Sequence, residues 1–229
     1  MTVALAGEVA TVDLAQSTVR ELNAALHAAD AGATFQVLRP AGRHAIAAGL
    51  NAAIDIEIDG SAGYYCAGMN QHATVRVRGS CGVGVAENMM SGRVEIDGDA
   101  GQSAASSAHG GLLVVHEDAA ARCAISLKGG DVVVAGSVGH ASAFMAQSGR
   151  LVVCGDAGDA LGDSIYETRV YVAGSVASLG ADCVEKPLRD EHREELAGLL
   201  AAAGVDADPA DFRRYGSART LYRVHGRAG

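Results

Sequence analysis

Cysteine and histidine are the residue types of this chain that could ligate a metal or act as nucleophile and base. The five cysteines are dispersed and form no C-x-x-C pair, which is typical of small buried residues in a reduced cytoplasmic protein. The eight histidines share no common place in the repeat described below, so they form no ladder of metal ligands. His109 and His140 remain as candidates for a general base, with a surface or core position as the alternative explanation of each.

Motifs of the common enzyme classes are absent. The chain has no G-x-S-x-G elbow, no P-loop and no H-E-x-x-H motif. It has no apolar run of about 18 residues that could span a membrane, and no basic region precedes an apolar run at the N-terminus. We therefore assign no catalytic, cofactor-binding or metal-binding residue, and we expect a cytoplasmic protein without a membrane segment.

A sequence repeat determines where each side chain lies in the predicted fold. A strand-like phrase recurs seven times at a fixed interval of 19 residues. Position 1 of each coil is apolar, position 3 is β-branched, position 5 is glycine in six coils of seven, and position 6 is Ser or Asp. A fixed period with two-residue alternation inside it predicts a solenoid of strands and turns. Position 1 is occupied by Ile56, Val75, Val94, Leu113, Val132, Leu151 and Val170.

This pattern predicts an all-β fold, a single-stranded parallel β-helix of about seven coils. Alternate apolar residues point inward, and a column of small residues that includes Ala67 and Ala86 implies a narrow, dry interior. Glycine followed by Ser or Asp suits a bend, where positive φ or a side-chain-to-backbone hydrogen bond is needed. A left-handed hexapeptide helix needs a turn of about 18 residues, and calcium-binding nonapeptide repeats need a glycine–aspartate spacing that is missing here.

Each end of an open β-helix exposes an unpaired strand edge, and the sequence offers a helix near each end. Thr18 and Glu21 form a capping-box pattern at the start of the first helix. Pro187 opens the second helical stretch, which stops at Gly204. We expect both helices to cap the rod. The predicted segments are an N-terminal strand and capping helix (1–53), the β-helix domain (54–186), a C-terminal helix (187–206) and a basic aromatic tail (207–229).

The outward face of the strands changes character along the rod. At position 2 the first three coils carry Glu57, Arg76 and Glu95, an acid–base–acid ladder suited to solvent. Coils four to seven are apolar at this position, with Val133 and Val152 among them. An apolar surface of this extent is expected to be covered, either by a helix of this chain or by a partner subunit.

The tail combines arginine with aromatic residues. From Phe212 onward the chain has five arginines and no acid, so the tail carries +5 and the remaining chain −14. Such a composition favours a strap that binds a partner subunit; a frayed terminus and docking on the chain's own acidic β-helix are the alternatives. The acidic body argues against nucleic acid as a partner. The candidate interface residues here are Arg213, Arg214, Tyr215, Tyr222 and Arg223.

Large, soft residues interrupt the small-residue repeat in the arc that follows each strand, in the phrases GYYCAGMN, GVGVAENMMSG, SAFMAQSG and LGDSIYE. Met and aromatic residues of this kind either fill a wide part of the core or form a protein interface. The candidate interface residues in the arcs are Tyr64, Tyr65, Met69, Glu87, Asn88, Met89, Met90, Phe144, Met145 and Asp163.

These phrases, together with the glycine repeat, resemble the GXGXG β-helix domain that ends the large subunit of glutamate synthase. The stand-alone form of that domain, the B-type subunit of methylamine–glutamate N-methyltransferase (N-methylglutamate synthase), is more similar still, from about Leu14 to Gly204. A small subunit of formylmethanofuran dehydrogenase is a more distant relative. The resemblance implies a right-handed β-helix without catalytic residues of its own.

The resemblance also implies partners. In the family the β-helix lies between a glutamine-amidotransferase-type unit and a synthase barrel that holds FMN and an iron–sulfur cluster. This chain has neither unit, and Thr2 stands where an amidotransferase needs its N-terminal cysteine. We expect a non-catalytic scaffold subunit of a complex that transfers a nitrogen-containing group between glutamate and methylamine, with FMN and the cluster on a partner. A glutamine-dependent glutamate synthase variant, and a free-standing β-helix enzyme using His109 or His140, are the alternatives.

Overall fold

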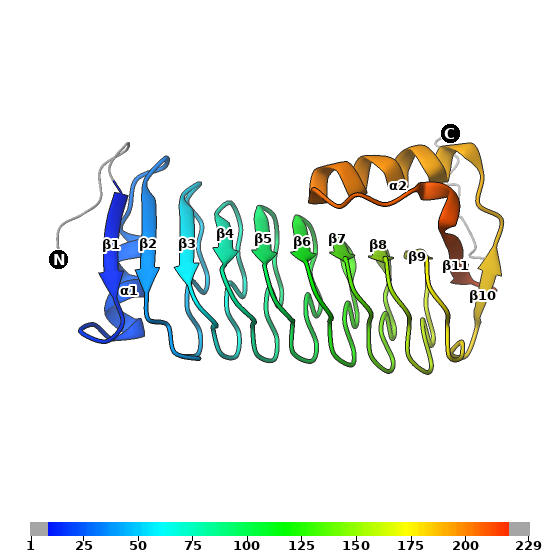
Figure 1. The fold of residues 1–229 in the computed structure, drawn as a ribbon, viewed down its shortest axis with the longest axis horizontal. Coiled ribbons are helices and arrows are strands. Elements are labelled where there is room, and N and C mark those ends of the chain that lie inside the picture. Colours follow the sequence, from blue (N-terminus) through cyan, green and yellow to red (C-terminus); the bar gives the residue numbers. More distant parts are fainter. Residues whose placement is uncertain (1–8, 220–229) are drawn as a thin grey trace, which may run out of the picture.

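The computed structural model describes residues 9–219, which form a rod of stacked strands (Figure 1). Nine strands pair side by side in chain order, all parallel, and successive position-1 residues such as Ile56 and Val75 are register partners. The predicted parallel β-solenoid with a 19-residue coil is therefore confirmed. The strands are β1 (Val9–Asp13), β2 (Thr34–Leu38), β3 (Asp55–Asp59), β4 (Thr74–Val77), β5 (Arg93–Ile96), β6 (Leu112–Val115), β7 (Lys128–Val134), β8 (Ser148–Val153) and β9 (Arg169–Val172).

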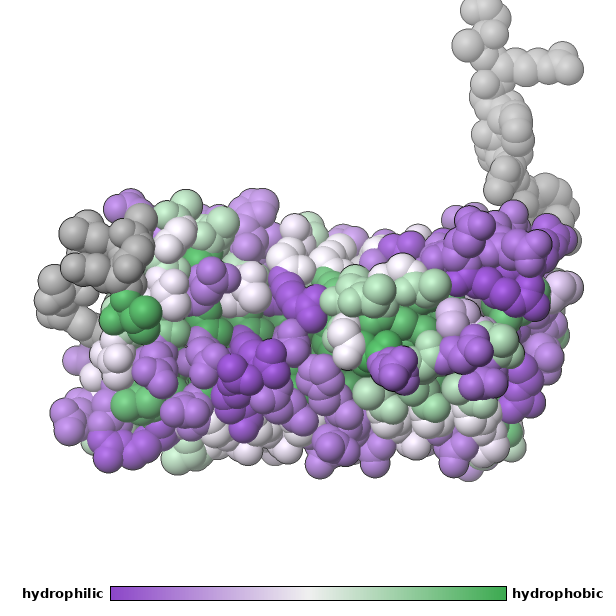
Figure 2. All heavy atoms as spheres, turned by 45° about the horizontal axis from the view of Figure 1, so that its top comes forward, coloured by the Kyte–Doolittle hydropathy of each residue, from purple (hydrophilic) through white to green (hydrophobic). Residues whose placement is uncertain are grey.

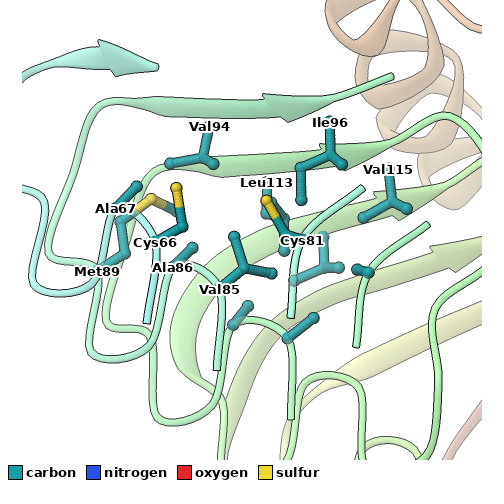
Figure 3. Close-up of a cluster of buried hydrophobic side chains, with 14 of the residues drawn as sticks. Cys66, Ala67, Cys81, Val85, Ala86, Met89, Val94, Ile96, Leu113 and Val115 are labelled. Carbon is teal, nitrogen blue, oxygen red and sulfur yellow. The ribbon is translucent and has the colours of Figure 1, made fainter. Parts of the chain in front are cut away.

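The interior is filled by the alternating residues of the strands and by small residues of the arcs. Val75 and Val77 are fully buried, while Arg76 between them points outward. Figure 3 shows how valine, alanine and cysteine side chains from successive coils fill the space inside the coil. Met89 lies among them and is fully buried, so the prediction that it is an interface residue is wrong.

The Ser/Asp column at position 6 is a hydrogen-bonded ladder. In the first six coils the side-chain oxygen of this residue accepts from the backbone N–H of the residue 19 places on, as in Ser80 to Asp99 (3.1 Å) and Asp118 to Ser137 (2.7 Å). These side chains satisfy backbone donors at the bend, where the strand pairing has ended. The column is therefore restricted to short side chains with an acceptor oxygen.

Glycine at position 5 is explained by the same ladder. A Cβ atom at Gly98 or Gly155 would lie 2.5 Å from the side-chain oxygen of Ser80 or Ser137 in the preceding coil. Of the glycines in this column, only Gly60 has a positive φ, +127°. The expectation of positive φ thus holds at one bend; at the others glycine makes room for the Ser/Asp side chain below it.

The N-terminal segment extends the ladder. Helix α1 (Val19–His27) begins at the predicted capping box, in which the Thr18 hydroxyl accepts from the Glu21 N–H. The side chain of Asn23 links α1 to the arc between β2 and β3 through hydrogen bonds to Ala45 and Ala47. Strand β2 precedes β3 by 21 residues instead of 19 in their paired register, so an exact-period search does not include it.

At the other end of the rod, the predicted C-terminal helix forms but does not cap the edge. Helix α2 (Asp190–Ala203) runs along the outside of the last coils (Figure 1). It covers the apolar outer face in a second core that includes Val133 and Val152 beneath Leu196 and Leu199. Both valines are fully buried there, so the chain's own helix covers this face and neither valine is available to a partner.

Antiparallel strands close the last edge instead of a helix. Strand β11 (Arg213–Ser217) pairs with β9 and with β10 (Cys183–Lys186), after the short 3-10 helix η1 (Pro209–Asp211). Phe212 lies in the second core, and Tyr215 in the main core. Residues 207–219 therefore belong to the fold and are no free strap, while Tyr222 and Arg223 lie outside the described residues. Neither described helix has the length and apolar character needed to cross a membrane.

Candidate interaction surface

The arcs that follow the strands form a rigid outer surface. In the first arc Tyr65, Ala67 and Met69 all have positive φ, between +53° and +59°. Their N–H groups bond alternately to the next coil and to the previous one: Tyr65 to Val83 (2.8 Å), Ala67 to Ile46 (2.9 Å). Each arc is thus held to both neighbours, and side chains at equivalent positions stack along the rod.

Two groups of large apolar side chains project from these arcs. The N-terminal patch consists of Tyr64, Tyr65, Met69 and Met90, each about half exposed. The C-terminal patch consists of Met145 and Tyr166, which are 44% and 40% exposed and line one surface hollow of about 490 Å³. Met69 and Met145 occupy the same position four coils apart, which corresponds to about 19 Å along the rod at about 4.8 Å per coil.

The backbone at these positions lies in the left-handed region, which is unfavourable for any residue other than glycine. Tyr65, Met69 and Met145 have φ of +59°, +56° and +52°, a region in which a side chain costs on the order of 1 kcal/mol. The equivalent position of Met69 holds Ser107 and Ser126 in the middle coils, also with positive φ. Because serine adopts the same φ as methionine here, the exposed methionine side chain is not needed for the backbone conformation, and its size favours a role in binding.

Within the N-terminal patch the tyrosines have defined supports. The Tyr64 ring stacks on the His44 ring, with centroids 4.6 Å apart. The Tyr65 ring lies against Gly84, where an added Cβ would come within 2.7 Å of it. Glycine is required there for this close approach, since Ser103 has a similar positive φ at the equivalent place in the next coil. The patch is therefore ordered before any partner binds.

The other candidate residues are distributed differently. Glu87, Asn88, Phe144 and Asp163 are half-buried in the arcs between and beside the patches. Arg213 is exposed and donates to the Gly174 carbonyl (2.7 Å), whereas Arg214 is half-buried. Tyr215 is only 2% exposed and is a core residue. Tyr166 is absent from the sequence-based candidates, although it is the one large aromatic residue of the phrase LGDSIYE.

Among residues 9–219, the thiols and imidazoles do not form a catalytic arrangement. Burial raises the pKa of Cys123 to about 12 and the pKa of Cys154 and of Cys183 to about 11, so these thiols are protonated at neutral pH. The Cys66 thiol shares a hydrogen bond with Cys81 that favours its neutral form, and this bond together with burial also raises the pKa of Cys66. His109 and His140 lie two coils apart on the exposed surface, and neither ring is hydrogen-bonded within residues 9–219.

One cluster has the composition of a metal site but the electrostatics of an ion-pair network. Oxygen and nitrogen atoms of Glu95, Asp97 and His116 lie within 4.8 Å of one another. Arg76 contacts both carboxylates, at 3.1 and 2.9 Å, and Arg93 contacts Glu95 at 2.8 Å. Burial alone would raise the pKa of Glu95, but bonds from His116 and Arg93 outweigh it and lower the pKa. The guanidinium groups of Arg76 and Arg93 therefore neutralise these carboxylates in the way that a bound metal cation would.

A glycine-punctuated parallel solenoid with rigid, ordered arcs defines the chain as a GXGXG β-helix protein. Comparison with known proteins gives the family. Protein GlxC of Rhizobium meliloti (strain 1021) is 56% identical over 218 residues, which cover 93% of this chain and 96% of GlxC, and the chain belongs to the GlxC family. No family model matches the chain, and no solved structure matches it.

Proposed function

We propose that the chain is a non-catalytic scaffold subunit of a glutamate-synthase-like complex. The observation that carries this proposal is the exposure of Tyr65, Met69 and Met145 on the outer arcs, where the position of the two methionines holds serine in the middle coils. Aromatic residues and methionine are enriched at protein interfaces. Two patches separated by about four coils suit two different partner chains.

The partners expected from the family resemblance are an amidotransferase-like chain and a synthase-like chain. The synthase-like chain would hold FMN and the iron–sulfur cluster. The thiols of Cys66, Cys123 and Cys183 are buried and protonated, and they lie in separate coils of the core, so they do not fit as cluster ligands. The proposed complex is N-methylglutamate synthase, which converts methylamine and glutamate to N-methylglutamate and ammonia. A glutamine-dependent variant follows from the same resemblance.

Purification of the chain alone and with the two partner chains tests this proposal. The isolated chain is expected to show no flavin absorbance, no iron and no turnover of glutamate with methylamine or with glutamine. The three-chain preparation is expected to elute as one species with activity. Stoichiometric flavin on the isolated chain would favour the free-standing enzyme. The same conclusion would follow if a His109 or His140 variant abolished turnover while Met69 and Met145 variants left it unchanged.

A further inference from the structure

A second feature lies at the C-terminal end of the rod, beside the C-terminal patch. A cavity of about 270 Å³ opens between the segment that leads into β9 and the β10–β11 hairpin. Its lining includes four cationic side chains, those of Arg169, Lys186, Arg214 and Arg219, and one acidic side chain, that of Glu167. We call it the cationic cavity. Figure 2 shows hydrophilic side chains gathered at the end of the rod where α2 begins.

Two of the four cations are already paired. Arg169 contacts Glu195 at 2.6 Å, and Arg219 forms an ion pair with Asp182. Among residues 9–219, Lys186 and Arg214 form no ion pair. The cavity therefore has an excess of positive charge on a chain whose formal net charge is −9.

A hydrogen bond to the backbone fixes the position of the Arg214 guanidinium group. The Nε atom of Arg214 donates a hydrogen bond of 3.0 Å to the Pro187 carbonyl, and the residue is half-buried. Burial, with a weaker contribution from the charges of Arg169 and Arg189, lowers the pKa of Arg214. An anion placed in the cavity would offset the cost of burying this charged group.

The other groups that line the cavity also suit a ligand with several oxygen atoms. The Ser217 hydroxyl, 9% exposed, accepts from the Arg219 N–H and keeps its own hydrogen available to donate. The volume of the cationic cavity lies just below the range of about 300–1,000 Å³ that is typical of ligand sites, which favours a small ligand. Cationic groups in a concave, partly buried site form short, charge-assisted hydrogen bonds with carboxylate or phosphate.

We propose that the cationic cavity binds a small oxyanion, either inorganic phosphate or a dicarboxylate of about four carbons, held by Lys186 and Arg214. This inference does not depend on the docking of partner chains. It assigns a ligand-binding role to a scaffold that carries no catalytic residue, at a place where the bound anion would adjoin the C-terminal patch.

Isothermal titration of the full chain with phosphate and, separately, with succinate tests the proposal, at an ionic strength held constant with sodium chloride. We expect a dissociation constant below about 1 mM for one of them, and the anion that binds identifies phosphate or carboxylate as the ligand chemistry. Lys186→Gln is expected to weaken binding about tenfold, because it removes one charge-assisted hydrogen bond. Glu167→Gln is expected to tighten binding, because it removes the acidic group that faces the anion.

Arg20→Gln is the matched control, since it removes the same charge from the exposed face of α1 at the opposite end of the rod. It is expected to leave the dissociation constant within about twofold of the unmodified chain. Lys186→Gln changes a strand side chain that forms no ion pair within residues 9–219, so thermal unfolding should stay close to that of the unmodified chain. Absence of binding heat for both anions at about 20 mM, or equal affinity of Lys186→Gln and the unmodified chain, would overturn the proposal.

Discussion

The hydroxyl group of Tyr171 donates a hydrogen bond of 2.6 Å to the carboxylate of Glu195, across the interface between the last coil and helix α2. Arg169 donates to the same carboxylate from Nε (2.8 Å), and Arg150 from a terminal nitrogen (3.1 Å). Near the C-terminal end of the helix, Arg93 donates to the Ala202 carbonyl (2.8 Å). Polar contacts near the middle and at the C-terminal end of α2 thus fix the helix over an apolar face that would otherwise accept it in several registers.

Glu195→Gln is expected to destabilise the chain by about 1.5–3 kcal/mol, because charge-assisted hydrogen bonds from Arg169 and Arg150 are lost. Burial alone would raise the pKa of Glu195, but bonds from Arg169, Tyr171 and Arg150 outweigh it and leave the pKa lowered. A lowered folded-state pKa stabilises the fold above the ordinary pKa of 4.5, and this contribution is lost as pH falls further.

Chemical denaturation from pH 7 to pH 3 measures this effect. The gap between the unmodified chain and Glu195→Gln should be constant near neutrality and should shrink below about pH 4.5. Glu194→Gln, on the exposed side of the same helix, is the control and should change stability by less than about 0.5 kcal/mol. A gap that does not depend on pH would show that the Glu195 carboxylate does not hold α2.

Val133→Glu is expected to cost at least about 3 kcal/mol, because it places a carboxylate beneath α2 without a partner. Thr74→Glu is the control, since Thr74 is exposed on β4 and is the register partner of Arg93. It should change the free energy of unfolding by less than about 0.5 kcal/mol. Equal, small effects of the two substitutions would mean that α2 does not cover this face.

Asp118→Ala is expected to cost about 1 kcal/mol, because the Ser137 N–H loses its acceptor at the bend. Asp118→Ser should restore most of this stability, since serine occupies the same column in the second and fifth coils. Thermal unfolding of the two variants distinguishes the ladder from a general effect of charge. If the Ala and Ser variants unfold alike, the side-chain ladder contributes nothing.

Ending the chain at Asp211 is expected to destabilise the solenoid by several kcal/mol, because it removes Phe212 from the second core and exposes the edge of β9. Circular dichroism and proteolysis would detect the loss of cooperative unfolding. The sequence-based prediction differs, because it treats this segment as a strap that binds a partner subunit and is not needed for folding. A truncated chain with unchanged stability would show that β11 is not part of the folded unit.

The sequence predicts the coil well because period, alternation and bend residues all act locally. It could not decide how α2 docks, since the leucines of that helix can cover either an end or a side of the rod. The misassignment of Met89 was avoidable: the same place in later coils holds Ala108, Leu127 and Ile165, which are all buried. Strand β11 was missed because Arg213–Ser217 is short and polar, and only Tyr215 in it marks an inward face.

Of the candidate surface, the sequence identified the residue types but not their exposure. Met89 and Met90 are adjacent, yet one is fully buried and the other 49% exposed. The positive φ values of Met69 and Met145 depend on hydrogen bonds to neighbouring coils, which no local pattern in the sequence encodes. The cationic cavity joins residues from three separate segments, so its composition is visible only in the fold.

The mass of the assembled complex, measured by analytical ultracentrifugation, tests the scaffold role most directly. Met69→Ser and Met145→Ser each replace methionine by the residue that occupies this position, with positive φ, at Ser107 and Ser126. We predict that each variant leaves the isolated chain as stable as before but weakens the binding of one partner chain, by about tenfold. Ser107→Ala is the control and should assemble normally. Full assembly of the double variant Met69→Ser/Met145→Ser at micromolar concentration would contradict the proposal that the arcs dock partner subunits.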